Sequence, residues 1–253
     1  MELLEILKIS GVMVLGCLVQ SSAGFGFGLF ALPILLFLGF DLPQSVMIVV
    51  TGSAIQKITA VTYLRKDVDW KGLLPYMLTG LAALPLGVYL MYRVSFLSQP
   101  QAKQIIGFCI LALVLLQWRR VHTPGNGVHP GWGYLAGFFS GVLNGLANIG
   151  GPPLVFWILA HGWSNEKMRV TALAFSLVFV PFQVGLMVLG FGVPILDSLW
   201  KTILLTPVIL LGSWLGLRIG AAFSRENLRL YMRFLLIIIA VSALLGPLLS
   251  STG

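Results

Sequence analysis

The sequence predicts an all-α, polytopic helical membrane protein built from two homologous halves. Hydrophobic residues make up 58% of the 253-residue chain and charged residues only 9%, whereas a soluble domain carries about a quarter charged residues. The apolar residues lie in near-continuous runs rather than in alternation, which indicates membrane-spanning helices and not the strands of a barrel. The whole chain, residues 1–253, is therefore predicted to form a single transmembrane domain with the lipid bilayer as its solvent.

Eight apolar segments can be counted, and the first and the fifth are each interrupted by a polar, glycine-rich patch. We call residues 20–28, at the head of the stretch Gln20–Pro33, break 1, and Asn144–Pro153 break 2. The expected segments are Leu4–Val19 with Phe27–Phe40, Gln44–Leu64, Gly72–Tyr92, Gln104–Trp118, Gly131–Leu143 with Pro153–Ala160, Val170–Phe191, Leu199–Phe223 and Leu230–Leu249.

A turn-rich stretch divides the chain near its middle. Residues 119–130 are the least apolar part of the sequence, and they separate a first repeat, residues 1–120, from a second, residues 128–253. Each repeat begins with an interrupted segment and continues with three plain ones. The third span of each repeat carries a glycine six positions before an arginine, at Gly87 and at Gly212. This shared order of features predicts a duplication.

The basic residues distinguish two paths for the interrupted segments. A straight helix over Glu5–Phe40 would be about 54 Å long, against a hydrocarbon core of about 30 Å, so each segment is a broken crossing or a hairpin. Single crossings divide the basic residues seven against eight, whereas hairpins divide them four against eleven, with Lys57 left out as intramembrane. The positive-inside rule then predicts hairpins, a cytoplasmic basic side and both termini outside. Two halves that each begin with such a hairpin have opposite orientations in the membrane, and they therefore form an inverted repeat. In the hairpin arrangement, the four basic residues on the side of the membrane with fewer of them are Lys8, Arg93, Lys103 and Lys201.

Both breaks are expected to line one anion site. Irregular backbone at membrane depth has to be buried in protein or to line a wet cavity. The helices that follow the breaks begin with free amides and a positive partial charge, and two such termini near the midplane suit an anion. An intramembrane lysine such as Lys57 costs about 3 kcal/mol on insertion scales. The predicted substrate-binding residues are Gln20, Ser21, Ser22, Gly24, Gly26, Gly28, Gln56, Lys57, Asn144, Asn148, Gly150, Gly151 and Gln183.

Structural roles compete with this interpretation. Glycines in membrane helices also permit close packing, Lys57 could snorkel or pair with another side chain, and Asn144 and Asn148 could bridge helices. The eight acidic residues are expected in loops or at segment ends, so no carboxylate relay is predicted. No metal-ligand spacing, nucleophile–base pair or phosphate loop is present, so neither enzyme activity nor a metal or cofactor is predicted. The basic residues are spread over loops, which argues against nucleic acid.

The two patches also resemble a known family. Gly24-Phe25-Gly26 followed by Pro33, echoed by Asn144-x-x-x-Asn148-Ile-Gly-Gly-Pro-Pro, resembles the sulfite exporter TauE/SafE family over the full chain. The resemblance implies a bacterial inner-membrane permease for sulfur-containing anions such as sulfite, sulfonates and sulfoacetate-like compounds. We expect export by alternating access, with an anion channel or a permease for carboxylates or other small anions as alternatives. A homodimer is compatible with so small a bundle, although no sequence feature demonstrates one.

Overall fold

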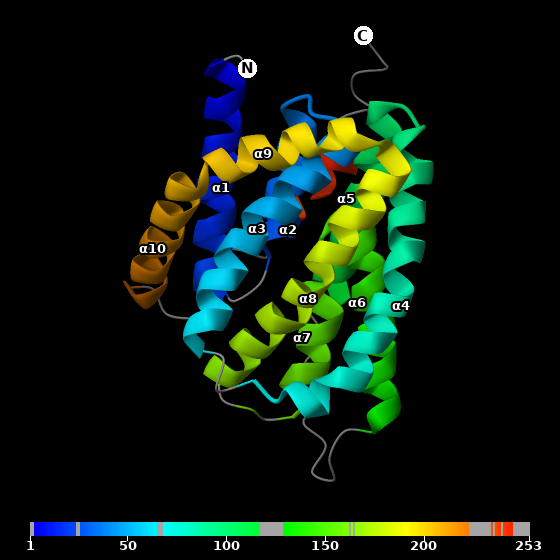
Figure 1. Ribbon diagram of the computed structural model, residues 1–253, viewed down its shortest axis with the longest axis vertical. Helices are drawn as coiled ribbons and strands as arrows, with labels where there is room; N and C mark the ends of the chain where they lie inside the picture. Colours follow the sequence, from blue (N-terminus) through cyan, green and yellow to red (C-terminus); the bar gives the residue numbers. More distant parts are fainter. Residues whose placement is uncertain are drawn as a thin grey trace.

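The protein folds as a helical bundle. The computed structural model describes residues 3–23, 26–64, 68–116, 129–161, 163, 165–222, 234, 236–238 and 240–244, and all regular structure within them is helical. The elements are α1 (Leu3–Ala23), α2 (Phe27–Phe37), α3 (Leu42–Leu64), α4 (Trp70–Ser95), α5 (Gln99–Leu116), α6 (Pro130–Ala147), α7 (Gly151–Leu159), α8 (Asn165–Phe191), η2 (Val193–Ile195), α9 (Leu196–Leu204) and α10 (Thr206–Ala222). Figure 1 shows α9 lying across one end of the bundle.

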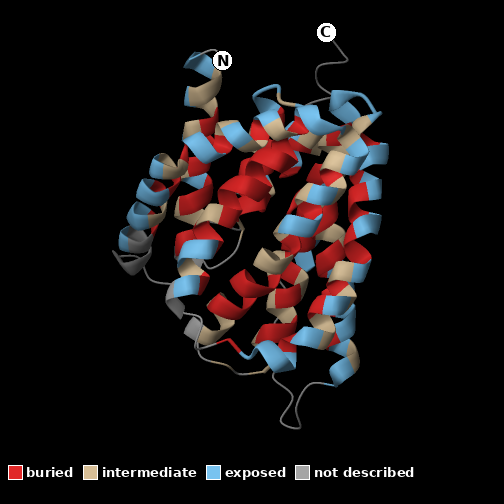
Figure 2. Cartoon of the chain, viewed as in Figure 1, coloured by how far each residue is buried: buried red, intermediate tan, exposed pale blue. Residues whose placement is uncertain are grey.

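The helices have the length and polarity of a multi-pass membrane protein. α1, α3, α4, α5 and α8 are each long and apolar enough to cross a membrane, and the bent unit of η2, α9 and α10 raises the number to as many as six among the described residues. Large apolar side chains lie on the outer faces, where Leu189 is 84% exposed and Phe108 65% exposed, while the buried residues face the interior (Figure 2). The expected segment Leu230–Leu249 falls largely outside the described residues, although 236–238 and 240–244 are helical.

The expected plain helix Leu199–Phe223 is wrong, because the chain breaks at Leu205 and bends by 55° between α9 and α10. Pro207 accounts for the break, since it has no N–H for the Ile203 carbonyl and restricts the residue before it. The Thr206 hydroxyl donates to that carbonyl instead, at 2.6 Å. Thr206 and Pro207 interrupt the apolar run at this point, so the sequence carries a signal for the bend that the count of apolar residues alone misses.

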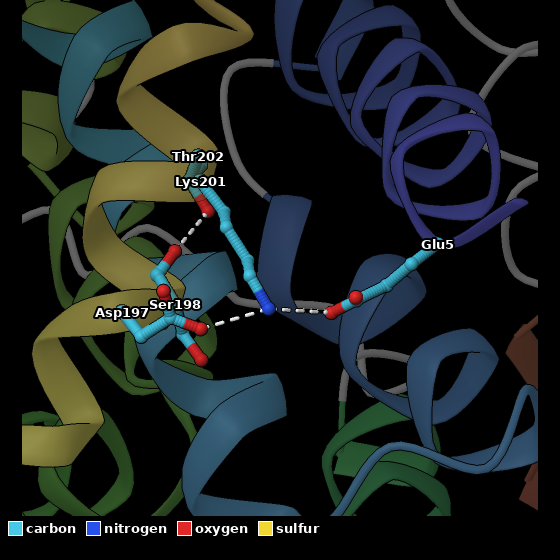
Figure 3. Close-up of polar contacts among 5 residues, drawn as sticks. All are labelled: Glu5, Asp197, Ser198, Lys201 and Thr202. Atoms are coloured by element: carbon cyan, nitrogen blue, oxygen red, sulfur yellow. Dashed lines mark hydrogen bonds and ion pairs between the residues drawn. The ribbon is translucent and has the colours of Figure 1, made fainter. Parts of the chain in front are cut away.

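An ion-pair cluster fastens α9 to the start of α1. Lys201 Nζ lies 3.0 Å from Glu5 Oε1 and 2.8 Å from Asp197 Oδ2 (Figure 3). Within α9, the Thr202 hydroxyl donates to the Ser198 carbonyl at 2.8 Å. These contacts join the N-terminal turn of the first half to a helix of the second half.

Both interrupted segments turn back toward the end of the bundle from which they start. In Figure 1, α1 runs away from the end marked N and α2 returns to it, while α6 starts at the opposite end and α7 returns there. The end of α2 meets the start of α5, where Gln99 Nε2 donates to the Gly39 carbonyl at 3.5 Å. This is the path that hairpins require. The orientation of the two halves in a bilayer stays a prediction.

Glycines carry two close helix contacts that correspond between the halves. α4 of the first half packs on α6 of the second, and a Cβ on Gly87 would lie 2.1 Å from the Val142 carbonyl oxygen. α10 of the second half packs on α1 of the first, and a Cβ on Gly212 would lie 3.1 Å from Val14 Cα. Small residues let helix backbones approach closely in membranes. The exchange of equivalent helices agrees with a duplication, which also stays a prediction.

Candidate functional site

Break 1 directs the positive end of α2 into the protein. Gly26 caps the helix with φ 105°, a left-handed value that glycine adopts without strain. The amides of Phe27, Gly28 and Leu29 follow it and have no intrahelical acceptor. All three residues line one cavity, so the free amides of α2 and their partial charge lie at its wall. Two expected features, Gly24 and the side chain of Ser22, lie outside the described residues.

Break 2 is shaped by a left-handed asparagine. Asn148 ends α6 with φ 53° and ψ 35°, a conformation that asparagine adopts more readily than most residues that have a side chain. Its N–H donates to the Asn144 carbonyl at 2.8 Å, and the Ile149 N–H donates to the Leu143 carbonyl at 3.2 Å. This pattern closes a helix C-terminus, and α7 begins directly after Gly150.

The two helix starts offer different numbers of donors. A helix start leaves four amides without intrahelical acceptors, but Pro152 and Pro153 occupy the first turn of α7 and carry no N–H. α7 therefore keeps only the amides of Gly150 and Gly151. We expected the first turns of both helices to supply amide donors. In the structure, α2 supplies most of these free amides, and α7 supplies only two.

The two breaks touch each other. A Cβ on Gly28 would lie 2.2 Å from the Asn148 carbonyl oxygen, so only glycine allows this approach. The cavity beside the contact has a volume of about 40 Å³, which is room for about three water molecules or one small anion. Its polar side chains are Gln20, Ser53, Lys57, Asn144, Asn148 and Ser176, and its apolar walls include Phe27, Ile149, Pro152 and Leu173.

Lys57 is the charged side chain of the cavity. It projects from α3, is 5% exposed, and has no acidic neighbour among the described lining residues. The ion pairs found in the described part of the chain join Lys201 to Glu5 and Asp197, and none involves Lys57. A buried cation without a counter-ion is costly unless a ligand supplies one.

Two amide groups place further donors at the cavity. Gln20 is 4% exposed and Asn144 3% exposed. Gln20 Nε2 and Asn144 Nδ2 have no hydrogen-bond acceptor within the described structure. Buried hydrogen-bond donors are nearly always paired, so each of these two unpaired amide groups calls for an explanation. A bound ligand with an acceptor atom would pair with them. Together with Lys57 and the amides of α2, they provide several donors around one small volume.

Four expected site residues lie outside the cavity lining, namely Ser21, Gln56, Gly150 and Gln183. Gln56 Nε2 donates to the Cys17 carbonyl at 3.2 Å and to Ser21 Oγ at 2.6 Å. Gln183 Nε2 donates to the Asn144 carbonyl at 2.6 Å. The side chains of both glutamines thus hold the helices that lead into the breaks.

Side chains from α3 and α6 hold break 2 in place. Asn148 Nδ2 donates to Ser53 Oγ at 3.0 Å and to the Val49 carbonyl at 3.4 Å. The Ser140 hydroxyl donates to the Gly150 carbonyl at 2.6 Å. Asn148 therefore both borders the cavity and bridges helices. Its position is compatible with a role in binding as well as with a structural role.

Three residues near the site were not expected there. Ser53 lies four positions before Lys57 and Ser176 lies seven before Gln183, so helical spacing could have placed them on the same faces. Arg169 was expected only as part of the basic charge at a segment end. It donates to a carbonyl in the last turn of α1 at 2.5 Å, where a cation also suits the helix dipole.

Comparisons with known proteins identify the family. The family model described as "Sulfite exporter TauE/SafE" matches residues 9–243. A curated relative from Cupriavidus necator, named "Probable sulfite/organosulfonate exporter TauE", is 24% identical over 245 residues, which cover 90% of this chain and 89% of the relative. No solved structure matches the chain.

Proposed function

Because the chain belongs to the sulfite exporter TauE/SafE family, we propose that it is a secondary transporter that exports a small sulfur-containing anion, such as sulfite or a sulfonate, by alternating access. The membrane is the bacterial inner membrane. The observation that carries the proposal is the grouping of Lys57, the unpaired amides of Gln20 and Asn144, and the free amides of α2 around one cavity. The small size of that cavity favours an inorganic anion or a short sulfonate.

The electrostatics favour an anion over a neutral or cationic substrate. Hydrogen-bond donors and a helix N-terminus do not stabilise the charge of Lys57, since they add to the positive potential around it. A bound oxyanion would pair with the ammonium group and accept from the amides at the same time. Sulfite and sulfonate groups present several acceptor oxygens on one centre, so they match donors that converge from α1, α2, α3 and α6.

The membrane potential can drive export without a proton relay. No Asp or Glu occurs among the described residues that line the cavity. An inside-negative potential drives an anion outward with about 2.3 kcal/mol per charge per 100 mV. Potential-driven export is therefore the version of the mechanism that needs the fewest groups beyond those at the site.

A thermal-shift screen of purified protein against sulfite, methanesulfonate, sulfate and acetate tests the substrate class. Sulfite or methanesulfonate should raise the melting temperature in a saturable manner. In Lys57→Met the affinity should fall about tenfold or more, because a charged hydrogen bond contributes about 1.5–3 kcal/mol. Lys103→Met, a lysine variant at the start of α5, is the matched control and should bind like wild type.

Other outcomes of the screen contradict the proposal in distinct ways. The absence of a shift with every anion would remove the binding function. Stabilisation by acetate alone would favour a carboxylate permease. Flux that never saturates with sulfite in proteoliposomes would identify an anion channel.

A further inference from the structure

Two hydrogen bonds of the same kind occupy corresponding places in the two halves. In the first half, Gln56 of α3 donates from Nε2 to the Cys17 carbonyl of α1. In the second half, Gln183 of α8 donates from Nε2 to the Asn144 carbonyl of α6. Donor and acceptor are 39 residues apart in both. Gln183 thus lies 127 positions after Gln56, and Asn144 lies 127 positions after Cys17.

Both bonds connect an interrupted helix to the centre of the bundle. α1 leads into break 1 and α6 leads into break 2, while α3 and α8 pack against each other. Gln56 is 6% exposed and Gln183 1% exposed. A buried amide is unfavourable in apolar surroundings unless it finds a partner, so each glutamine favours the one arrangement in which a carbonyl of the interrupted helix meets it.

The two halves differ in what surrounds these bonds. Gln56 Nε2 also donates to Ser21 Oγ at 2.6 Å. The position 127 residues after Ser21 is Asn148, which donates to Ser53 and not to Gln183. Transporters with inverted repeats rock one element against another around a fixed site, and the two halves of such a protein are arranged differently in any single access state. The unequal surroundings of the two glutamines agree with that behaviour.

We propose that Gln56 and Gln183 are a pair of positioning residues, related by the duplication, that set the balance between the two access states. This inference rests on the proposed transport function and on the inverted repeat. In an inverted repeat, the Gln56 bond holds α1 against α3 and the Gln183 bond holds α6 against α8, and the two bonds act from opposite sides of the membrane. Loss of one bond therefore favours one access state, and loss of the other favours the opposite state.

Hydrogen–deuterium exchange of the purified transporter, in Gln56→Met, Gln183→Met and the double variant, tests this directly. The two ends of the bundle are monitored at residues 95–103 and 129–136. Each single variant should change the ratio of the exchange rates at the two ends by about threefold to tenfold, because this is the change in an equilibrium constant that one net hydrogen bond produces. The two single variants should change this ratio in opposite directions. The double variant should return toward the wild-type ratio. The sulfite dissociation constant should stay within about threefold, since neither side chain lines the cavity.

Gln104→Met provides a matched control, because Gln104 also donates from Nε2 to a carbonyl of another segment, that of Leu244 at 3.5 Å, but away from the breaks. It should leave the exchange ratio unchanged. Asparagine variants at 56 and 183 keep the amide and shorten its reach, and they replace any methionine variant that does not fold. Shifts in the same direction, or no shift, contradict the inference, as does a loss of sulfite affinity of about tenfold or more. Wild-type protein that binds no anion would instead contradict the proposed function.

Discussion

Lys57 brings a positive charge to a place where the neighbouring groups add to its cost. A lysine at membrane depth costs about 3 kcal/mol on insertion scales, and the nearby donors of Gln20, Asn144 and α2 carry positive partial charge. A bound oxyanion reverses each of these unfavourable terms, since it neutralises the ammonium group and accepts from the amides. We therefore expect the proposed site to be more stable with a bound anion than without one.

At the scale of single residues, Gly28→Ala tests the contact between the two breaks. The added Cβ would lie 2.2 Å from the Asn148 carbonyl oxygen, so α2 has to move away from break 2. We expect the free energy of unfolding to fall by about 1–3 kcal/mol, as in other overpacked sites. We also expect the stabilisation by sulfite to disappear, as measured by thermal unfolding with and without the anion.

Gly185→Ala is the matched control in α8. A Cβ at Gly185 meets nothing within 4 Å, and alanine in a helix interior is more stable than glycine by about 0.5–1 kcal/mol. This variant should bind sulfite like wild type. A Gly28→Ala protein that also binds sulfite like wild type would show that the contact between the breaks has no bearing on the site.

At the scale of elements, the bend between α9 and α10 depends on a side chain that replaces a missing amide. Pro207 cannot donate to the Ile203 carbonyl, and the Thr206 hydroxyl does so at 2.6 Å. Thr206→Val should therefore lower the free energy of unfolding by about 1 kcal/mol, the net contribution of one hydrogen bond. Chemical unfolding in detergent measures the difference.

Thr59→Val in α3 controls for the loss of the hydroxyl itself. The Thr59 hydroxyl donates to the Ile55 carbonyl at 3.1 Å, but that carbonyl lies inside a regular helix and also receives the Thr59 amide. The variant should change stability by less than about 0.5 kcal/mol. Equal losses in the two variants would contradict the role assigned to Thr206.

Sequence patterns predicted the elements of the site better than the directions of its side chains. The breaks, the hairpin path and the burial of Lys57 follow from apolar runs, glycine clusters and charge. The same reasoning expected Gln56 and Gln183 to bind substrate, whereas in the structure they donate to the Cys17 and Asn144 carbonyls. The position of a residue along a helix does not determine which neighbour its side chain meets. Ser53 was missed because a serine in an apolar helix is common, and its role depends on the left-handed Asn148 of another helix.

At the scale of the whole molecule, the hairpins determine which loops share a side of the membrane. In Figure 1, α6 and α8 both start at the end of the bundle opposite the N-terminus. We therefore expect cysteines at His122 and Asn165, in a chain whose Cys17 and Cys109 are replaced, to react with an impermeant maleimide from the cytoplasmic side. A cysteine at Gln99 should react from the outside. Labelling of positions 122 and 165 from opposite sides would contradict the hairpins.

The central claim is that an anion crosses the membrane through the cavity between the two breaks. Efflux of labelled sulfite from proteoliposomes, at a series of loaded concentrations and with an imposed inside-negative potential, tests it most directly. The wild-type protein should give saturable efflux that accelerates with the potential, by up to about 2.3 kcal/mol of driving force per charge per 100 mV. Lys57→Met should lose this efflux while Lys103→Met keeps it. Efflux that is equal in wild type and Lys57→Met, or that is absent from wild type, would contradict the account.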